Sequence, residues 1–281
     1  MTDGLAVVDK PPGMTSHDVV GRCRRIFAQK RVGHAGTLDP DATGVLLVGL
    51  GRVTRLMQYM SGLGKAYTTD IVLGAATTTL DDAGEVTGTW DMSSVTLDQA
   101  RAVATGLTGA IQQVPPMVSA VKVGGRRLHQ LAREGIEVER APRTVTVERF
   151  VVDWSAPGVL RAEIECSSGT YIRVLADDLG RLLGGGAHVR NLRRTRVGPW
   201  RDHEAVPLDA TGPDAVLAPA AALPWLEAVT VSGEVEALVR VGRRLSGADL
   251  GAHGPGPWRV ITEAGQLLAV YEQDRRVVLV P

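Results

Sequence analysis

The chain has 281 residues, 44% of them hydrophobic, and its 31 basic residues balance 31 acidic residues to a net charge of zero. This length suits one large or two modest domains with a buried core. No apolar run approaches the roughly 18 residues of a membrane span, the N-terminus lacks a signal-peptide pattern, and two distant cysteines support neither a disulfide framework nor a zinc site. The composition predicts a globular protein of a reducing cytoplasm.

Two segments of the chain are strongly basic although its net charge is zero. Residues 22–31 hold five basic side chains and residues 181–201 hold six, with no acidic residue in either, whereas acidic residues gather around 70–91. Either tract alone is typical of a solvated helix face. Together they can form a phosphate-binding face.

The first half of the chain mixes short strands with amphipathic helices. An apolar strand at residues 4–10 ends at a Pro-Pro-Gly segment. Thr15 has the character of a helix N-cap, with Asp18 completing a loose capping box, and the helix is predicted to reach about Gln29. The later pattern predicts a helix at 51–60, a strand at 65–74, a loop or hairpin at 77–91 and a helix at 97–107. Asp81 and Asp82 are expected to lie in a solvated turn of that hairpin.

The second half contains more strands. Residues 112–135 are predicted to run from extended chain into a helix, and strands are predicted at 143–152 and 159–166. A strand-to-helix junction follows at 169–173, where a side chain can point into a cleft. The remaining predictions are a helix ended by glycines 184–186, a proline-rich connection at 206–225, and a β unit with strands at 258–262, 267–271 and 277–280.

One segment, residues 33–49, carries the features of an active site. Pro40 fixes its own φ and keeps Asp39 out of the helical region, so the Asp39 carboxylate is held on a turn beside the apolar run 45–48. Asp41 is more typical of a residue that caps the turn. The segment begins like a calcium loop, yet its twelfth position is Leu50 instead of a bidentate glutamate.

Other familiar sites are also excluded. The glycines of the segment have P-loop spacing, but no Lys-Ser/Thr follows them. A metal-dependent hydrolase that uses His34, Asp39 and Asp41 is excluded because the sequence offers no further metal ligands. What remains is a turn with one carboxylate, one nearby imidazole and no cofactor motif.

Residues 33–44 resemble the catalytic motif of the TruB family of tRNA pseudouridine synthases. Residues 9–16, 166–180 and 188–198 resemble further motifs of that family, and residues 112–135 resemble its RNA-clamping insertion. The resemblance is specific over roughly residues 5–200 and softer beyond. Lys10, in the first of these motifs, is expected to be structural or to support the site. The candidate phosphate contacts of the insertion are Lys122, Arg126, Arg127 and Arg133.

The resemblance implies an α+β fold. Its parts are a pseudouridine synthase catalytic domain at 1–225, with a mixed, mainly antiparallel sheet, flanking helices and an RNA-clamping insertion at about 110–143, and a small β-rich PUA-like RNA-binding domain at 226–281.

The resemblance also assigns the site residues. Asp39 is the one essential catalytic residue, and Arg173 is suited to pair with it, because an adjacent guanidinium keeps a carboxylate ionised and orients it. The implied substrate-binding residues are His34, Tyr67, Tyr171, Arg173 and Leu192. His34 occupies the space that the flipped base leaves, and Tyr67 stacks on that base. Tyr171 and Leu192 line its pocket. Without the resemblance, Tyr67 and Leu192 are ordinary residues of a strand and a core, and His34 satisfies backbone groups of the turn.

The implied function is isomerisation of uridine to pseudouridine at position 55 of the tRNA T loop, with no cofactor and no metal. The expected partner is the T stem-loop of tRNA, with no membrane, no obligate protein partner and a monomeric, cytoplasmic enzyme. Short length and the lack of basic tails favour the bacterial stand-alone form over the guide-RNA-dependent relatives. A non-catalytic RNA-binding or RNA-chaperone protein is the alternative, although such a protein has no need of the carboxylate.

Overall fold

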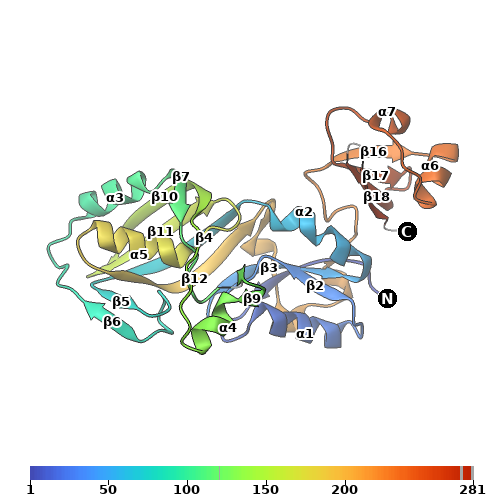
Figure 1. Cartoon of the computed structure of the whole chain (residues 1–281). Helices are drawn as coiled ribbons and strands as arrows, with labels where there is room; N and C mark the ends of the chain where they lie inside the picture. Colours follow the sequence, from blue (N-terminus) through green and yellow to red (C-terminus); the bar gives the residue numbers. More distant parts are fainter. Residues whose placement is uncertain (120, 273–274, 280–281) are drawn as a thin grey trace. The chain divides into compact units, whose positions relative to one another are not determined.

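The computed structural model of the chain describes residues 1–119, 121–272 and 275–279 (Figure 1). The side chains of Lys122, His129, Arg133 and residues 275–279 lie outside this description. The chain forms two compact units: the first combines residues 1–62 with 197–281, and the second holds residues 63–196. Among the helices of the described residues, none could span a membrane. The predicted domain limits, 1–225 and 226–281, stay a prediction.

The first unit is built around strand β1 (Gly4–Lys10). β1 pairs antiparallel along its whole length with β3 (Thr43–Leu50), whose end also pairs with β2 (Val32–Ala35). The other edge of β1 is covered by two short strands, the parallel β14 (Val206–Pro207) and the antiparallel β15 (Val216–Leu217). Strands that are far apart in the sequence therefore meet at β1.

Helix α1 (Ser16–Ile26) begins where the sequence predicts, because Thr15 and Asp18 form a reciprocal capping box. The predicted end at Gln29 is wrong. The helix stops at Ile26, Ala28 adopts a left-handed φ of 48°, and the Gln29 side chain exchanges two hydrogen bonds with the Thr2 backbone, at 2.8 and 3.0 Å. A contact distant in sequence therefore ends the helix.

The core of the first unit lies between α1 and the strands. Its buried side chains come from β1, α1, β2, β3 and a later short helix: Ala6, Val8, Val19, Val20, Cys23, Val32, Leu46, Val48, Leu50 and Leu208. The short elements of this unit are η1 (Gly51–Leu56), α2 (Met57–Ser61), β13 (Trp200–Arg201), η2 (Asp202–Glu204), η3 (Leu208–Ala210) and η4 (Pro213–Ala215). The helix predicted at 51–60 is thus a 3₁₀ turn followed by a short α-helix.

A separate four-stranded sheet forms near the C-terminus. Its order is β16 (Glu227–Val231), β17 (Trp258–Thr262), β18 (Leu267–Glu272) and β19 (Arg275–Leu279), parallel at the first pair and antiparallel afterwards. Trp258 and Tyr271 anchor its core, beside α6 (Gly233–Arg240) and α7 (Gly247–Leu250). The predicted strands at 258–262 and 267–271 are confirmed. The strand predicted at 277–280 includes residue 280, which lies outside the described residues.

The second unit is a sheet in the order β12 (Ala187–Val197), β4 (Lys65–Leu73), β11 (Val159–Cys166), β10 (Arg143–Ala156) and β7 (Gly109–Gln113). The last four strands are antiparallel neighbours. Buried and half-buried residues alternate along β4, as expected for a strand with one covered face.

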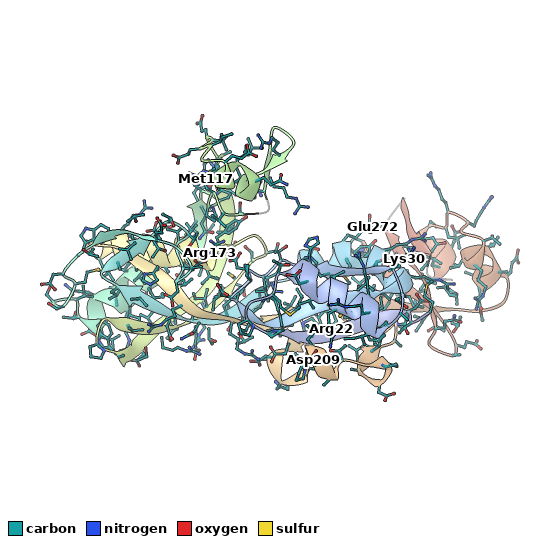
Figure 2. All side chains as sticks on the ribbon, turned by 90° about the horizontal axis from the view of Figure 1, so that it is seen from below. Arg22, Lys30, Met117, Arg173, Asp209 and Glu272 are labelled. Carbon is teal, nitrogen blue, oxygen red and sulfur yellow. The ribbon has the colours of Figure 1, made fainter. Side chains whose placement is uncertain are left out.

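The described part of the second unit also contains three helices and two hairpins. Helix α3 (Leu97–Gly106) contacts β10 and α5 (Ile172–Leu182). The hairpin predicted at 77–91 is formed by β5 (Ala75–Thr77) and β6 (Val86–Thr89). The insertion contains β8 (Lys122–Val123), β9 (Arg126–Arg127) and α4 (Leu128–Arg133), and Figure 2 shows it, with Met117, standing apart from the sheet of this unit.

Candidate active site

The loop between β2 and β3 presents Asp39. It leaves β2 through Gly36, whose φ of 78° is left-handed, and Gly44, at the start of β3, has a φ of 98°. Leu38 is buried, Asp39 is half-buried and Pro40 is exposed. The carboxylate therefore sits at the edge of the core, as the sequence predicts.

Lys10 fastens this loop from the end of β1. The residue is fully buried, and its Nζ donates hydrogen bonds to the carbonyl oxygens of Pro11 at 2.8 Å, Pro40 at 2.7 Å and Ala42 at 2.8 Å. An ammonium has three donors, so these carbonyls can use all of them. The chain on the C-terminal side of Asp39 is thus tied to the central strand.

Ser16 fastens the N-terminal side of the same loop. Its hydroxyl accepts a hydrogen bond from the Leu38 N–H at 2.9 Å and donates one to the Leu38 carbonyl at 3.1 Å. Ser16 is the first residue of α1 and is buried. Together, Ser16 and Lys10 hold the backbone on both sides of Asp39.

His34 lies on β2, opposite Val48 of β3. Its ring meets the ring of His17 edge-on, with centroids 5.3 Å apart and an interplanar angle of 81°. His17 is exposed on the first turn of α1, and His34 is half-buried. His34 and Asp39 therefore lie in the same strand–loop segment, as the sequence predicts.

The two tyrosines lie in the second unit. Tyr67 is on β4, opposite Ile164, and is 8% exposed. Tyr171 is the N-cap residue of α5, and its backbone exchanges two hydrogen bonds with the buried Gln113 side chain, at 3.0 and 3.3 Å. Gln113 was not identified from the sequence, because its partner is distant along the chain.

Arg173 lies in the first turn of α5 (Figure 2). It is only 3% exposed, which excludes a solvated helix start. Its guanidinium donates to the Thr79 carbonyl at 2.7 Å and the Val118 carbonyl at 2.9 Å. It also lies 3.5 Å from the Asp81 carboxylate. The expectation that Asp81 lies in a solvated turn is therefore wrong: its side chain is 23% exposed and helps to hold Arg173.

Leu192, on β12, is half-buried, so it does not belong to the fully buried core. The preceding residue, Asn191, has a left-handed φ of 55° and donates to Asp70 at 2.8 Å. Asp39 and His34 lie in the first unit, whereas Tyr67, Tyr171, Arg173 and Leu192 lie in the second. The expected pairing of Arg173 with Asp39 stays a prediction.

The two basic tracts offer fewer free side chains for binding phosphate than their sequence suggests, because several of their arginines are paired or buried. Arg22 points toward Asp209 and forms an ion pair with it at 3.1 Å (Figure 2). In the second tract Arg194 is fully buried, and Arg181 and Arg196 pair with acidic side chains. In the insertion Arg126 pairs with Glu134. The side chains of Lys122 and Arg133 lie outside the described residues.

Comparisons with known proteins identify family models and relatives that the chain resembles. Residues 24–172 match the model of the TruB family pseudouridylate synthase N-terminal domain, and residues 173–212 match the tRNA pseudouridylate synthase B C-terminal domain. A tRNA pseudouridine synthase B of Symbiobacterium thermophilum is 50% identical over 245 residues, covering 85% of this chain and 82% of the relative. That of Cutibacterium acnes is 46% identical over 287 residues, covering 98% and 94%.

Solved structures give the same result for the fold. A chain of a Cbf5-Nop10-Gar1 complex matches with a TM-score of 0.73 and 28% identity, covering 98% of this chain and 79% of that chain. The matches define the class of pseudouridylate synthases, which are isomerases. Within that class, the chain belongs to the TruB family. The predicted α+β fold of the pseudouridine synthase type is confirmed, and the PUA-like character of the C-terminal sheet stays a prediction.

Proposed function

We propose that the protein converts uridine to pseudouridine at position 55 in the T loop of tRNA, with Asp39 as the catalytic residue. The relatives named tRNA pseudouridine synthase B support a tRNA substrate, because they match nearly the whole chain. The observation that carries the proposal is the fastening of the Asp39 loop by Lys10 and Ser16 on either side. A carboxylate held this way is preorganised for chemistry.

The reaction breaks the N1 glycosidic bond, turns the base and joins C5 to the same sugar carbon. It consumes no redox equivalent and no phosphate energy, so a carboxylate and a shaped pocket are sufficient. A carboxylate is competent to attack the sugar C1′ or to abstract a sugar proton on the way to a glycal. Attack at C6 of uracil is the third route.

The other residues bind and orient the flipped uridine. His34 fills the space that the base leaves, and Tyr67 replaces its lost stacking partners, a contact that stabilises a base by about 1–3 kcal/mol. Tyr171 and Leu192 line the pocket. Arg173 pairs with Asp39, keeping the carboxylate ionised and aligned.

The remaining expectations belong to the same proposal. The insertion with β8, β9 and α4 clamps the T stem-loop, and Arg127 is half-buried while Arg126 is exposed on its hairpin. The enzyme works as a cytoplasmic monomer, without cofactor, metal or obligate protein partner.

The test is release of label from C5 of uridine in an unmodified tRNA transcript. The wild type should release one equivalent per tRNA. The Asp39→Asn protein should release no label, and the wild type should release none from a transcript with cytidine at position 55. Release from the cytidine-55 transcript would refute the assigned position. Tight binding of tRNA without release by the wild type would leave the RNA-binding alternative.

A further inference from the structure

His188, on β12, joins two separate points of the β5–β6 hairpin. Its Nδ1 lies 2.9 Å from the Ala75 carbonyl oxygen, at the start of β5. Its Nε2 lies 3.0 Å from Oδ1 of Asp82, at the turn between the strands. The His188 side chain is 10% exposed, whereas the Asp82 side chain is 50% exposed. Both partners accept hydrogen bonds, and a neutral imidazole donates from one of its two nitrogens. His188→Ala removes both contacts.

The turn held by His188 is the turn that holds Arg173. The Arg173 guanidinium bonds to the Thr79 carbonyl at 2.7 Å and approaches Asp81 at 3.5 Å. The neighbour of His188, Val189, donates its N–H to the Leu80 carbonyl at 3.1 Å. Residues 79–82 therefore bind β12 through His188 and Val189, and they bind the start of α5 through Arg173.

The turn has a conformation that needs outside support. Leu80 has a left-handed φ of 63°, which is unfavourable for a residue with a branched side chain. Inside the turn, Thr77 donates to the Asp81 carbonyl at 2.8 Å, and the Ala83 N–H donates to the Asp81 carboxylate at 3.2 Å. These bonds orient Asp81, and the contacts made by His188 and Val189 tie the turn to β12.

We infer that Asp82 and His188 form a positioning pair for catalysis. The pair fixes the 79–82 turn, and through Thr79 and Asp81 it fixes the Arg173 guanidinium. The inference rests on the proposed function, in which Arg173 orients Asp39. Neither member of the pair touches the substrate. Loss of either should lower the rate of the chemical step and leave tRNA affinity unchanged.

The test measures single-turnover rate constants of pseudouridine formation and dissociation constants for tRNA. His188→Ala and Asp82→Ala should each lower the rate constant about 10-fold, as expected when a hydrogen bond to a charged group is lost. The double variant should lose no more than the worse single variant. Glu85→Ala, which removes an exposed carboxylate of the same hairpin, is the matched control and should keep the wild-type rate.

The His188→Ala substitution made in an Arg173→Lys protein distinguishes a positioning role from general structural damage. In an Arg173→Lys protein, adding His188→Ala should cause no further loss, because the group that the pair positions is gone. If the losses in rate constant from the two substitutions multiply in that protein, the inference is overturned. An unchanged rate constant in Asp82→Ala would also overturn it, because the exposed site of Asp82 leaves folding intact. An inactive wild type would instead refute the proposed function.

Discussion

The Nζ of Lys10 lies 2.7 Å from the carbonyl oxygen of Pro40, the residue that directly follows Asp39. Lys10→Met keeps an unbranched apolar side chain, one atom shorter, and removes every donor. Because three backbone carbonyls then lose their shared charged donor, the free energy of unfolding should fall by about 2–4 kcal/mol, and pseudouridine formation should fall with it. Urea denaturation measures the first effect. Lys30→Met, at an exposed site of the same unit, is the control; equal stability of the two variants would refute the role of Lys10.

Ser16 should affect catalysis more than binding. Ser16→Ala removes both hydrogen bonds to the Leu38 backbone, which should cost about 1–3 kcal/mol of stability. Since Leu38 precedes Asp39, the single-turnover rate constant should fall while the dissociation constant for tRNA stays the same. Ser232→Ala, at the exposed start of α6, provides the comparison. A weaker affinity with an unchanged rate constant would contradict this prediction.

Lys65 should make stability depend on pH in the alkaline range. Burial, and then the positive charge of Arg194, lowers the pKa of Lys65 to about 8 from its usual 10.5. Between these values the unfolded chain binds more protons than the folded chain, so the stability of the wild type relative to Lys65→Met should rise with pH. The slope reaches at most about 1.4 kcal/mol per pH unit. Urea titrations of both proteins at pH 7 to 10 measure it, and a constant difference would refute the shift.

Asp18 should contribute in the opposite pH range. Hydrogen bonds from the Thr15 side chain and backbone lower the pKa of Asp18 below its usual 3.8. The carboxylate therefore stabilises the fold above that value, and the contribution is lost as the pH falls through the folded-state pKa. Thermal unfolding of the wild type and Asp18→Asn should differ at pH 6 and converge in strong acid. Asp98→Asn, in the first turn of α3, is the control.

The residues show where prediction from the sequence works. Thr15 and Asp18 are three positions apart, so their capping box is a local property and was predicted. The partners of Arg173 lie 94 and 55 positions away, so the junction at α5 was predicted but the burial of Arg173 was not. Asp81 was wrongly expected to be solvated for the same reason. Lys10 could be suspected only from its motif, because its acceptors Pro40 and Ala42 are distant in sequence.

The pairing of β1 with strands from the far end of the chain has a consequence during translation. Val8 pairs with Val206, and Leu5 pairs with Leu217, so one edge of β1 stays open until the whole second unit has been synthesised. At about 5–20 residues per second this interval lasts about 10–40 s. An open apolar strand is a template for pairing with another chain. Newly made copies on crowded polysomes are therefore most prone to aggregate in this interval, and slower initiation, which spaces the ribosomes, should raise the yield of folded enzyme.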